Sequence, residues 1–115
     1  DEELLYRVML VLSKTTECSD TSVVRYLVEG EVVSLTLPHC HSARTRLRLR
    51  VLEMIGNIGA SELKSEVTTL EVVQAVAQSY SSSEARISHR YACTLQILTK
   101  DCSQQQARIM IPFIP

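Results

Sequence analysis

Five arginines recur at fixed spacings, and their arrangement could bind anionic groups. Arg50 stands 43 positions after Arg7, and Arg90 stands 40 positions after Arg50. Arg46 and Arg86 each precede a member of that row by four residues. Because residues four apart share one side of a helix, both rows would project from the same side of stacked helices. Stacked helices lie about 8 to 10 Å apart, so the guanidinium groups could pair with carboxylates or phosphates along an extended peptide.

The alternative interpretation is that these arginines lie on solvated helix faces. Arg44, Arg46, Arg48 and Arg50 alternate along one segment, and a spacing of two spreads side chains around a helix. Arginine stems also cover apolar neighbours while the charge stays in water. The sequence alone leaves both interpretations open.

Histidine and cysteine residues give only a weak indication of a metal site. His39, Cys40 and His41 are adjacent, and His89 and Cys93 have the i, i+4 spacing that places two ligands on one side of a helix. Neither group has a C-x-x-C companion. Ordinary packing and a polar loop explain both groups, so we predict no metal.

The sequence contains no recognisable catalytic constellation. A cysteine-histidine hydrolase needs an oxyanion loop and an acid that orients the histidine, and neither can be identified. The glycines of residues 56–59 lie at an expected helix end and not after a strand, so they do not form a phosphate-binding loop. We therefore expect no enzyme activity and no cofactor.

Length and composition limit the remaining classes. The chain has 115 residues, 45% of them hydrophobic, which suits one domain with its own core. A net charge of −1 and an aromatic content of 4% disfavour nucleic acid as a partner. No apolar run reaches the roughly 18 residues that span a bilayer, so we expect no membrane partner. The four cysteines lie in or beside expected helices, which favours a reducing compartment, cytoplasmic or nuclear, over a disulfide framework.

Three long amphipathic helices are expected to position the arginines, over residues 2–16, 42–60 and 84–101. Apolar residues at spacings of three and four define the buried side of each helix. That side carries Leu5, Val8, Met9, Leu12 and Thr15 in the first helix, Leu49, Leu52, Met54, Ile55 and Ile58 in the second, and Ala85, Ala92, Leu95, Ile97 and Leu98 in the third. The chain opens on Asp1, inside a helical pattern, which suggests a segment of a longer protein.

Shorter helices are expected between the long ones. Gly30 should end the first short helix, and Pro38 should end the second because proline cannot donate the next backbone hydrogen bond. The expected short helices cover residues 21–29, 31–37, 63–69, 71–80 and 103–111.

Two segments of the chain resemble a known family of helical repeats. Residues 27–35, Leu-Val-Glu-Gly-Glu-Val-Val-Ser-Leu, are similar to the hinge between the first two helices of an armadillo repeat. Residues 55–60, Ile-Gly-Asn-Ile-Gly-Ala, resemble the end of its third helix. Steps of 43 and 40 residues lie within the range of about 40 to 47 that is typical of such repeats. The three-helix count and Gly30 favour the armadillo form over the related HEAT form.

The resemblance covers nearly the whole chain and implies an all-α fold. The expected architecture is a right-handed α-solenoid of three-helix armadillo-like repeats, in one domain over residues 1–115. Its parts would be a partial repeat at 1–18, repeats at 19–61 and 62–102, and a partial repeat at 103–115.

In armadillo proteins the third helices line a concave groove, and the resemblance places Asn57 where an asparagine often binds the backbone of an extended peptide. The matching positions in the other long helices are Lys14 and Ile97, so an asparagine ladder does not continue. The places where nuclear-import members carry tryptophan hold Leu10, Glu53 and Cys93. A groove for nuclear localisation signals is therefore not expected.

We therefore expect a non-enzymatic adaptor that binds an acidic or phosphorylated extended segment of another protein. The expected groove residues are Arg7, Arg46, Arg50, Glu53, Asn57, Arg86 and Arg90. One alternative is a structural solenoid segment that acts through end-to-end docking or self-association. A second alternative is phosphate binding of nucleic acid by the same basic row.

Overall fold

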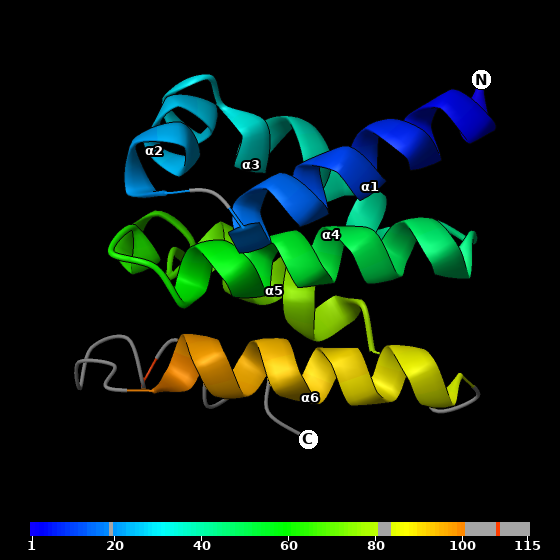
Figure 1. The fold of residues 1–115 in the computed structure, drawn as a ribbon. Coiled ribbons are helices and arrows are strands. Elements are labelled where there is room, and N and C mark those ends of the chain that lie inside the picture. The colour runs from blue at the N-terminus through cyan, green and yellow to red at the C-terminus, as the bar shows by residue number, and fades with distance from the viewer. Residues whose placement is uncertain (19, 81–83, 101–107, 109–115) are drawn as a thin grey trace.

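Three long helices lie side by side and form one layer of the molecule (Figure 1). They are α1 (Glu2–Cys18), α4 (Thr45–Gly59) and α6 (Ala85–Thr99), with α4 between the other two. This computed structural model describes residues 1–18, 20–80, 84–100 and 108. Every regular element among these residues is a helix, so the predicted all-α class is confirmed.

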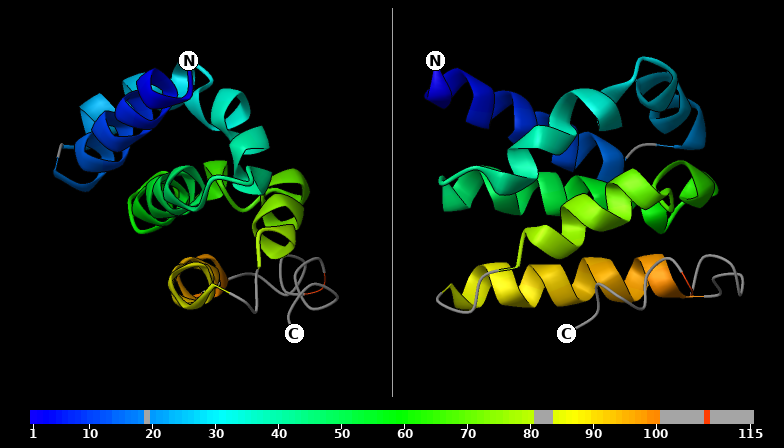
Figure 2. Two further views of the ribbon diagram at one scale, coloured as in Figure 1. Left: turned by 90° about the vertical axis from the view of Figure 1, so that its right-hand side faces the viewer. Right: turned by 180° about the vertical axis from the view of Figure 1, so that it is seen from behind.

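Shorter helices connect the long ones. The first link holds α2 (Thr21–Glu29), α3 (Val32–Thr36) and the 3-10 helix η1 (Leu37–His41); the second holds the 3-10 turn η2 (Lys64–Glu66) and α5 (Leu70–Gln78). Figure 2 shows η1 and α5 on the side of the long helices that is hidden in Figure 1. η1 packs against both α4 and α5, and α5 also contacts α6, so one side of α4 is covered from behind.

The core is centred on α4 because this helix is covered on three sides. The five apolar residues that the sequence predicted for its buried side are all buried, namely Leu49, Leu52, Met54, Ile55 and Ile58. Leu47 and Val51 are buried as well, so α4 is apolar around most of its circumference. Gly59 lets α6 approach closely, since a Cβ there would lie 3.1 Å from Leu98 Cδ2.

Local signals explain where several short helices start and stop. The Asp20 carboxylate accepts hydrogen bonds from the backbone N–H of Ser22 and Val23, at 3.1 and 3.2 Å, and so caps α2. At the other end, the N–H of Gly30 bonds to Tyr26 O, and α2 spans the predicted residues 21–29. The residue with left-handed backbone is the next one, Glu31, at a φ of 65°.

Two predictions about short helices were wrong. Pro38 does not end the helical path: α3 stops at Thr36, and η1 continues through Pro38 to His41. Proline is tolerated there because it lies in the first turn of η1, where the backbone N–H groups have no partner within the helix. The expected helix at 63–69 is only the 3-10 turn η2, and the residue before it, Leu63, has no side chain that could cap a longer helix.

The burial predictions for the outer long helices were partly wrong. Val8 is exposed, and the side of α1 that faces α4 carries the small polar residues Ser13 and Thr16 next to Met9. In α6, Ala85 and Ala92 are exposed, while Ile87, Tyr91 and Thr94 are buried beside the predicted Leu95 and Leu98. The expected helix at 103–111 and the partial repeat at 103–115 lie outside the described residues, apart from residue 108.

A search of the described helices for a membrane span found none with both the length and the apolar character that crossing a bilayer requires.

Candidate binding face

One carboxylate joins all three long helices. Glu53 on α4 accepts a hydrogen bond from Ser13 Oγ of α1 at 2.8 Å and forms an ion pair with Arg50 Nη1 at 2.9 Å. Its other oxygen, Oε1, lies 3.7 Å from Arg90 Nη2 of α6. Ser13, Glu53, Arg50 and Arg90 therefore meet on the side of the layer where α1, α4 and α6 come together. We call this side, with Tyr6, Arg46 and Arg86, the arginine face.

The surroundings of Glu53 favour its charged form. Burial by itself would raise the pKa of this carboxyl, but the hydrogen bonds from Ser13 and Arg50 and the charges of Arg50 and Arg90 outweigh it. The net effect is a lowered pKa. At neutral pH the arginine face thus has a fixed negative charge in its middle, which two guanidinium groups share.

Arg46 and Arg50 are held against a tyrosine of α1. The guanidinium carbon Cζ of Arg46 lies 3.9 Å from the centroid of the Tyr6 ring, a cation–π contact. Hydrogen bonding with Arg46, and then with Arg50, lowers the pKa of the Tyr6 phenol. For Arg50, burial alone would lower the pKa, yet the hydrogen bonds with Tyr6 and Glu53 raise it. Arg50 therefore keeps its charge. Arg46 forms no ion pair with the described residues.

Arg86 and Arg90 line a hollow between α4 and α6. The hollow has a volume of about 350 Å³ and is lined by Leu49, Glu53, Ala85, Arg86, His89 and Arg90. Arg86 is exposed and has no ion-pair partner within residues 1–18, 20–80 and 84–100. Two guanidinium groups thus face one carboxylate, which gives the hollow an excess of positive charge.

Arg7 does not join the other arginines. Its Nε lies 3.3 Å from Glu3 Oε1 on the same helix, and both side chains are largely exposed. Such an i, i+4 pair on a surface contributes a few tenths of a kcal/mol, about 0.3 to 0.5. Of the five predicted arginines, the contacts connect Arg46, Arg50 and Arg90 to one network, place Arg86 beside it and leave Arg7 in a pair of its own.

Asn57 lies at the junction of α4 and α1. Its amide nitrogen donates hydrogen bonds to Ser13 O at 3.0 Å and to Thr16 Oγ1 at 3.2 Å. These bonds hold two neighbouring helices of the layer together. The binding of a peptide backbone by Asn57 stays a prediction, and its amide nitrogen already has partners within the chain.

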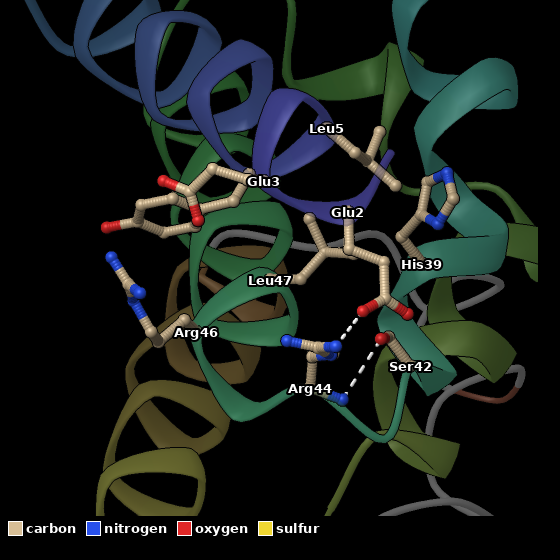
Figure 3. A pocket seen from close by; sticks show the side chains of 9 residues that line it. Glu2, Glu3, Leu5, His39, Ser42, Arg44, Arg46 and Leu47 are labelled. Carbon is tan, nitrogen blue, oxygen red and sulfur yellow. Dashed lines mark hydrogen bonds and ion pairs between the residues drawn. The ribbon is translucent and has the colours of Figure 1, made fainter.

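A second cavity lies at the other end of α4, between the first turns of α1, η1 and α4 (Figure 3). It has a volume of about 250 Å³ and is lined by Glu2, Glu3, Leu5, Tyr6, His39, Ser42, Arg44, Arg46 and Leu47. Glu2 forms an ion pair with Arg44, whose backbone N–H also bonds to Ser42 Oγ at 3.1 Å. Since two carboxylates face two guanidinium groups, this cavity has no excess charge for an anionic ligand.

The residues considered for a metal site do not assemble one. Cys93 Sγ lies 3.7 Å from His89 Nε2, but no group of three histidine, cysteine or acidic residues comes together in the described parts of the chain. Cys40 is fully buried, and burial raises the pKa of its thiol to about 12, which disfavours the thiolate that a metal would bind.

Sequence reasoning missed Tyr6 and Ser13 as members of the arginine face. The spacing of the repeats gives no signal for Ser13, because its equivalent in α4 is Gly56, whereas the equivalent of Glu53 in α1 is Leu10. Tyr6 has no such signal either, because its contact with Arg46 depends on how α1 packs on α4.

Comparisons of this chain with models of protein families, with curated proteins and with solved structures found no match.

Proposed function

We propose that this chain is a non-enzymatic adaptor that binds an acidic, extended segment of a partner protein across the arginine face. The observation that carries this proposal is the charge balance on that face. Arg46, Arg50, Arg86 and Arg90 lie on it, and Glu53 is the carboxylate that pairs with two of them. A chain with a net charge of −1 thus presents local positive charge, which attracts anionic segments.

The arrangement suits an extended ligand better than a compact one. The cations are spread over α4 and α6 and do not converge on one point, so a single small anion could reach only one or two of them. A peptide with acidic residues at intervals could pair with Arg46 at one end and Arg86 at the other while passing Glu53. Guanidinium groups favour such partners because they bind carboxylates and phosphates through two parallel hydrogen bonds.

The armadillo-like solenoid is part of the same proposal. It is supported by the steps of 43 and 40 residues between equivalent positions and by the side-by-side order of α1, α4 and α6. The free thiols of Cys40 and Cys93 agree with a reducing compartment, cytoplasmic or nuclear.

The test is a fluorescence anisotropy titration with a glutamate-rich peptide of about twelve residues, with its glutamine counterpart as the uncharged reference. We expect the glutamate peptide to bind more tightly, and the double variant Arg46→Glu, Arg86→Glu to lose at least about tenfold in affinity. These two arginines are suitable because neither forms an ion pair that stabilises the described fold. The matched control is Arg25→Glu on α2, an exposed arginine away from the face.

Equal affinities for the double variant and for Arg25→Glu would refute the proposal. A single-stranded oligonucleotide serves as the second probe. If the oligonucleotide binds more tightly than the peptide, with a steep dependence on salt, the partner is a nucleic acid and not a protein.

A further inference from the structure

The side of α1 that points away from α4 carries an apolar stripe. Leu4, Val8 and Val11 are 61%, 47% and 63% exposed. Their spacing of four and three residues places them on one side of the helix. Three large apolar side chains in a row at this exposure are unusual on a helix that already has a buried side.

The same three positions are buried in the other two long helices. With the steps of 43 and 40 residues, the positions equivalent to Leu4, Val8 and Val11 are Leu47, Val51 and Met54 in α4, and Ile87, Tyr91 and Thr94 in α6. All six are at most 5% exposed. In α4 this side lies toward α1, as the cavity shared by Leu47 and Tyr6 shows. In α6, Thr94 Oγ1 donates a hydrogen bond to Leu52 O of α4. The positions equivalent to the stripe are thus buried in both following helices, and Leu47 and Thr94 among them lie against the preceding long helix.

The opposite side of each long helix receives the next one. On α1, Ser13 and Thr16 contact α4, and on α4 the equivalent residues, Gly56 and Gly59, contact α6. A Cβ on Gly56 would lie 3.3 Å from Thr94 Oγ1, so this side must be small for close packing. On α6, Gln96 and Thr99 are equivalent to Gly56 and Gly59, and Ala92 is equivalent to Leu52 of α4 and Met9 of α1. These three are uncharged; Ala92 and Gln96 are exposed, and Thr99 is half-buried.

We propose that a second copy of this chain docks here, with the outer side of its α6 on the α1 stripe. The stack α1, α4, α6 (Figure 1) would then continue into the next copy in the same register. This contact is heterologous, because it joins two different surfaces, so it repeats from copy to copy and does not close into a symmetric dimer.

The charges near the stripe permit this contact. Arg7 is paired with Glu3 and Lys14 with Glu17, each within α1, so these two cations beside the stripe already have partners when it is covered. The gain is the burial of Leu4, Val8 and Val11, at about 25 cal/mol for each Å² of apolar surface.

The experiment is sedimentation equilibrium of the wild-type chain and of two surface variants, Val8→Glu on the stripe and Ala92→Glu on α6. Over a series from about 1 μM to 1 mM, where small interfaces associate, we expect the wild-type average mass to rise above the 12.9 kDa of one chain. Each variant alone should remain at the mass of one chain. An equimolar mixture of the two should reach twice that mass and no more, because Ala92→Glu still offers the stripe and Val8→Glu still offers α6.

A matched control is Val23→Glu, which changes an exposed valine on α2 and should associate as the wild type does. Circular dichroism verifies that each variant is helical. A wild-type mass of one chain at every concentration would overturn the proposal. Association of Ala92→Glu by itself would overturn it too, since the stripe would then pair with another stripe. A mixture that stays at the mass of one chain would exclude the α6 contact.

Discussion

Replacing Glu53 by glutamine should change stability and binding in opposite directions. Glu53→Gln keeps the size of the side chain and removes its charge. The hydrogen bond from Ser13 then has a neutral acceptor in place of a charged one, which lowers the free energy of unfolding by about 1 kcal/mol. The pair with Arg50 contributes about 0.5 kcal/mol more, because the Glu53 side chain is 22% exposed and water screens it in part. With a few tenths from Arg90 at 3.7 Å, we expect a loss of about 1.5 to 2 kcal/mol in the free energy of unfolding.

The assay is urea denaturation followed by circular dichroism, with Ser13→Ala and the double variant completing a thermodynamic cycle. We expect a coupling of at least about 0.5 kcal/mol between Ser13 and Glu53, since the two side chains touch. At the same time, Arg50 and Arg90 lose their shared carboxylate. The affinity for the glutamate-rich peptide should therefore rise by about three- to tenfold.

The dependence on pH provides a further check on Glu53. Its pKa in the folded chain lies below the usual 4.5, so the charged carboxylate stabilises the fold above that pH. This contribution is lost as the pH falls through the lowered folded value. The stability difference between the wild type and Glu53→Gln should thus be constant near neutral pH and shrink below about pH 4.5. A loss of less than about 0.5 kcal/mol at pH 7, or a difference that does not change down to pH 3, would refute the reasoning about Glu53.

Three further predictions follow from single positions. Gly59→Val should lower the free energy of unfolding by about 1 to 3 kcal/mol in urea denaturation, because even a Cβ would lie 3.1 Å from Leu98 Cδ2; an unchanged midpoint would mean that α4 and α6 can separate freely. Glu31→Gly should raise it by up to about 1 kcal/mol, since the residue has a φ of 65° that glycine adopts without strain; a loss in the same assay would show that the side chain stabilises the turn. Cys40 should resist iodoacetamide at pH 8 in the native chain, where a pKa of about 12 leaves about one thiol in ten thousand ionised, while the partly exposed Cys93 is alkylated. Peptide mapping by mass spectrometry measures both cysteines, and equal rates would contradict the burial of Cys40.

Much of the fold could be predicted because its signals are local. The period of the apolar residues in 42–60 indicated α4, and all five predicted buried residues are buried. The helix predicted over 21–29 is α2, and its Asp20 cap needs only the next three residues. The errors occurred where local signals are short or ambiguous. A proline ends an α-helix but is compatible with the first turn of a 3-10 helix, so Pro38 could not show by itself which path the chain takes.

Burial on the outer helices could not be predicted in the same way. Val8 has the spacing of a core residue, and its equivalents Val51 and Tyr91 are core residues. Its exposure depends on which helices stand beside α1, and a hydrophobic pattern does not contain that information. The hydrophobic pattern predicts which side of a helix can be buried, and the neighbouring elements determine whether that side is buried.

The helical class, the three long helices and the recurrence of arginine at steps of 43 and 40 residues could be predicted from the order of the residues. These features follow from periodicity and spacing along the chain. Which of the arginines are neutralised depends on the packing of the helices. Arg50 and Arg90 share Glu53 because α1 and α6 both pack on α4, whereas Arg86 remains without a carboxylate among the described residues. Ion pairs between helices depend on distances of 3 to 4 Å between side chains, and these distances are set by packing and not by the order of residues along the chain.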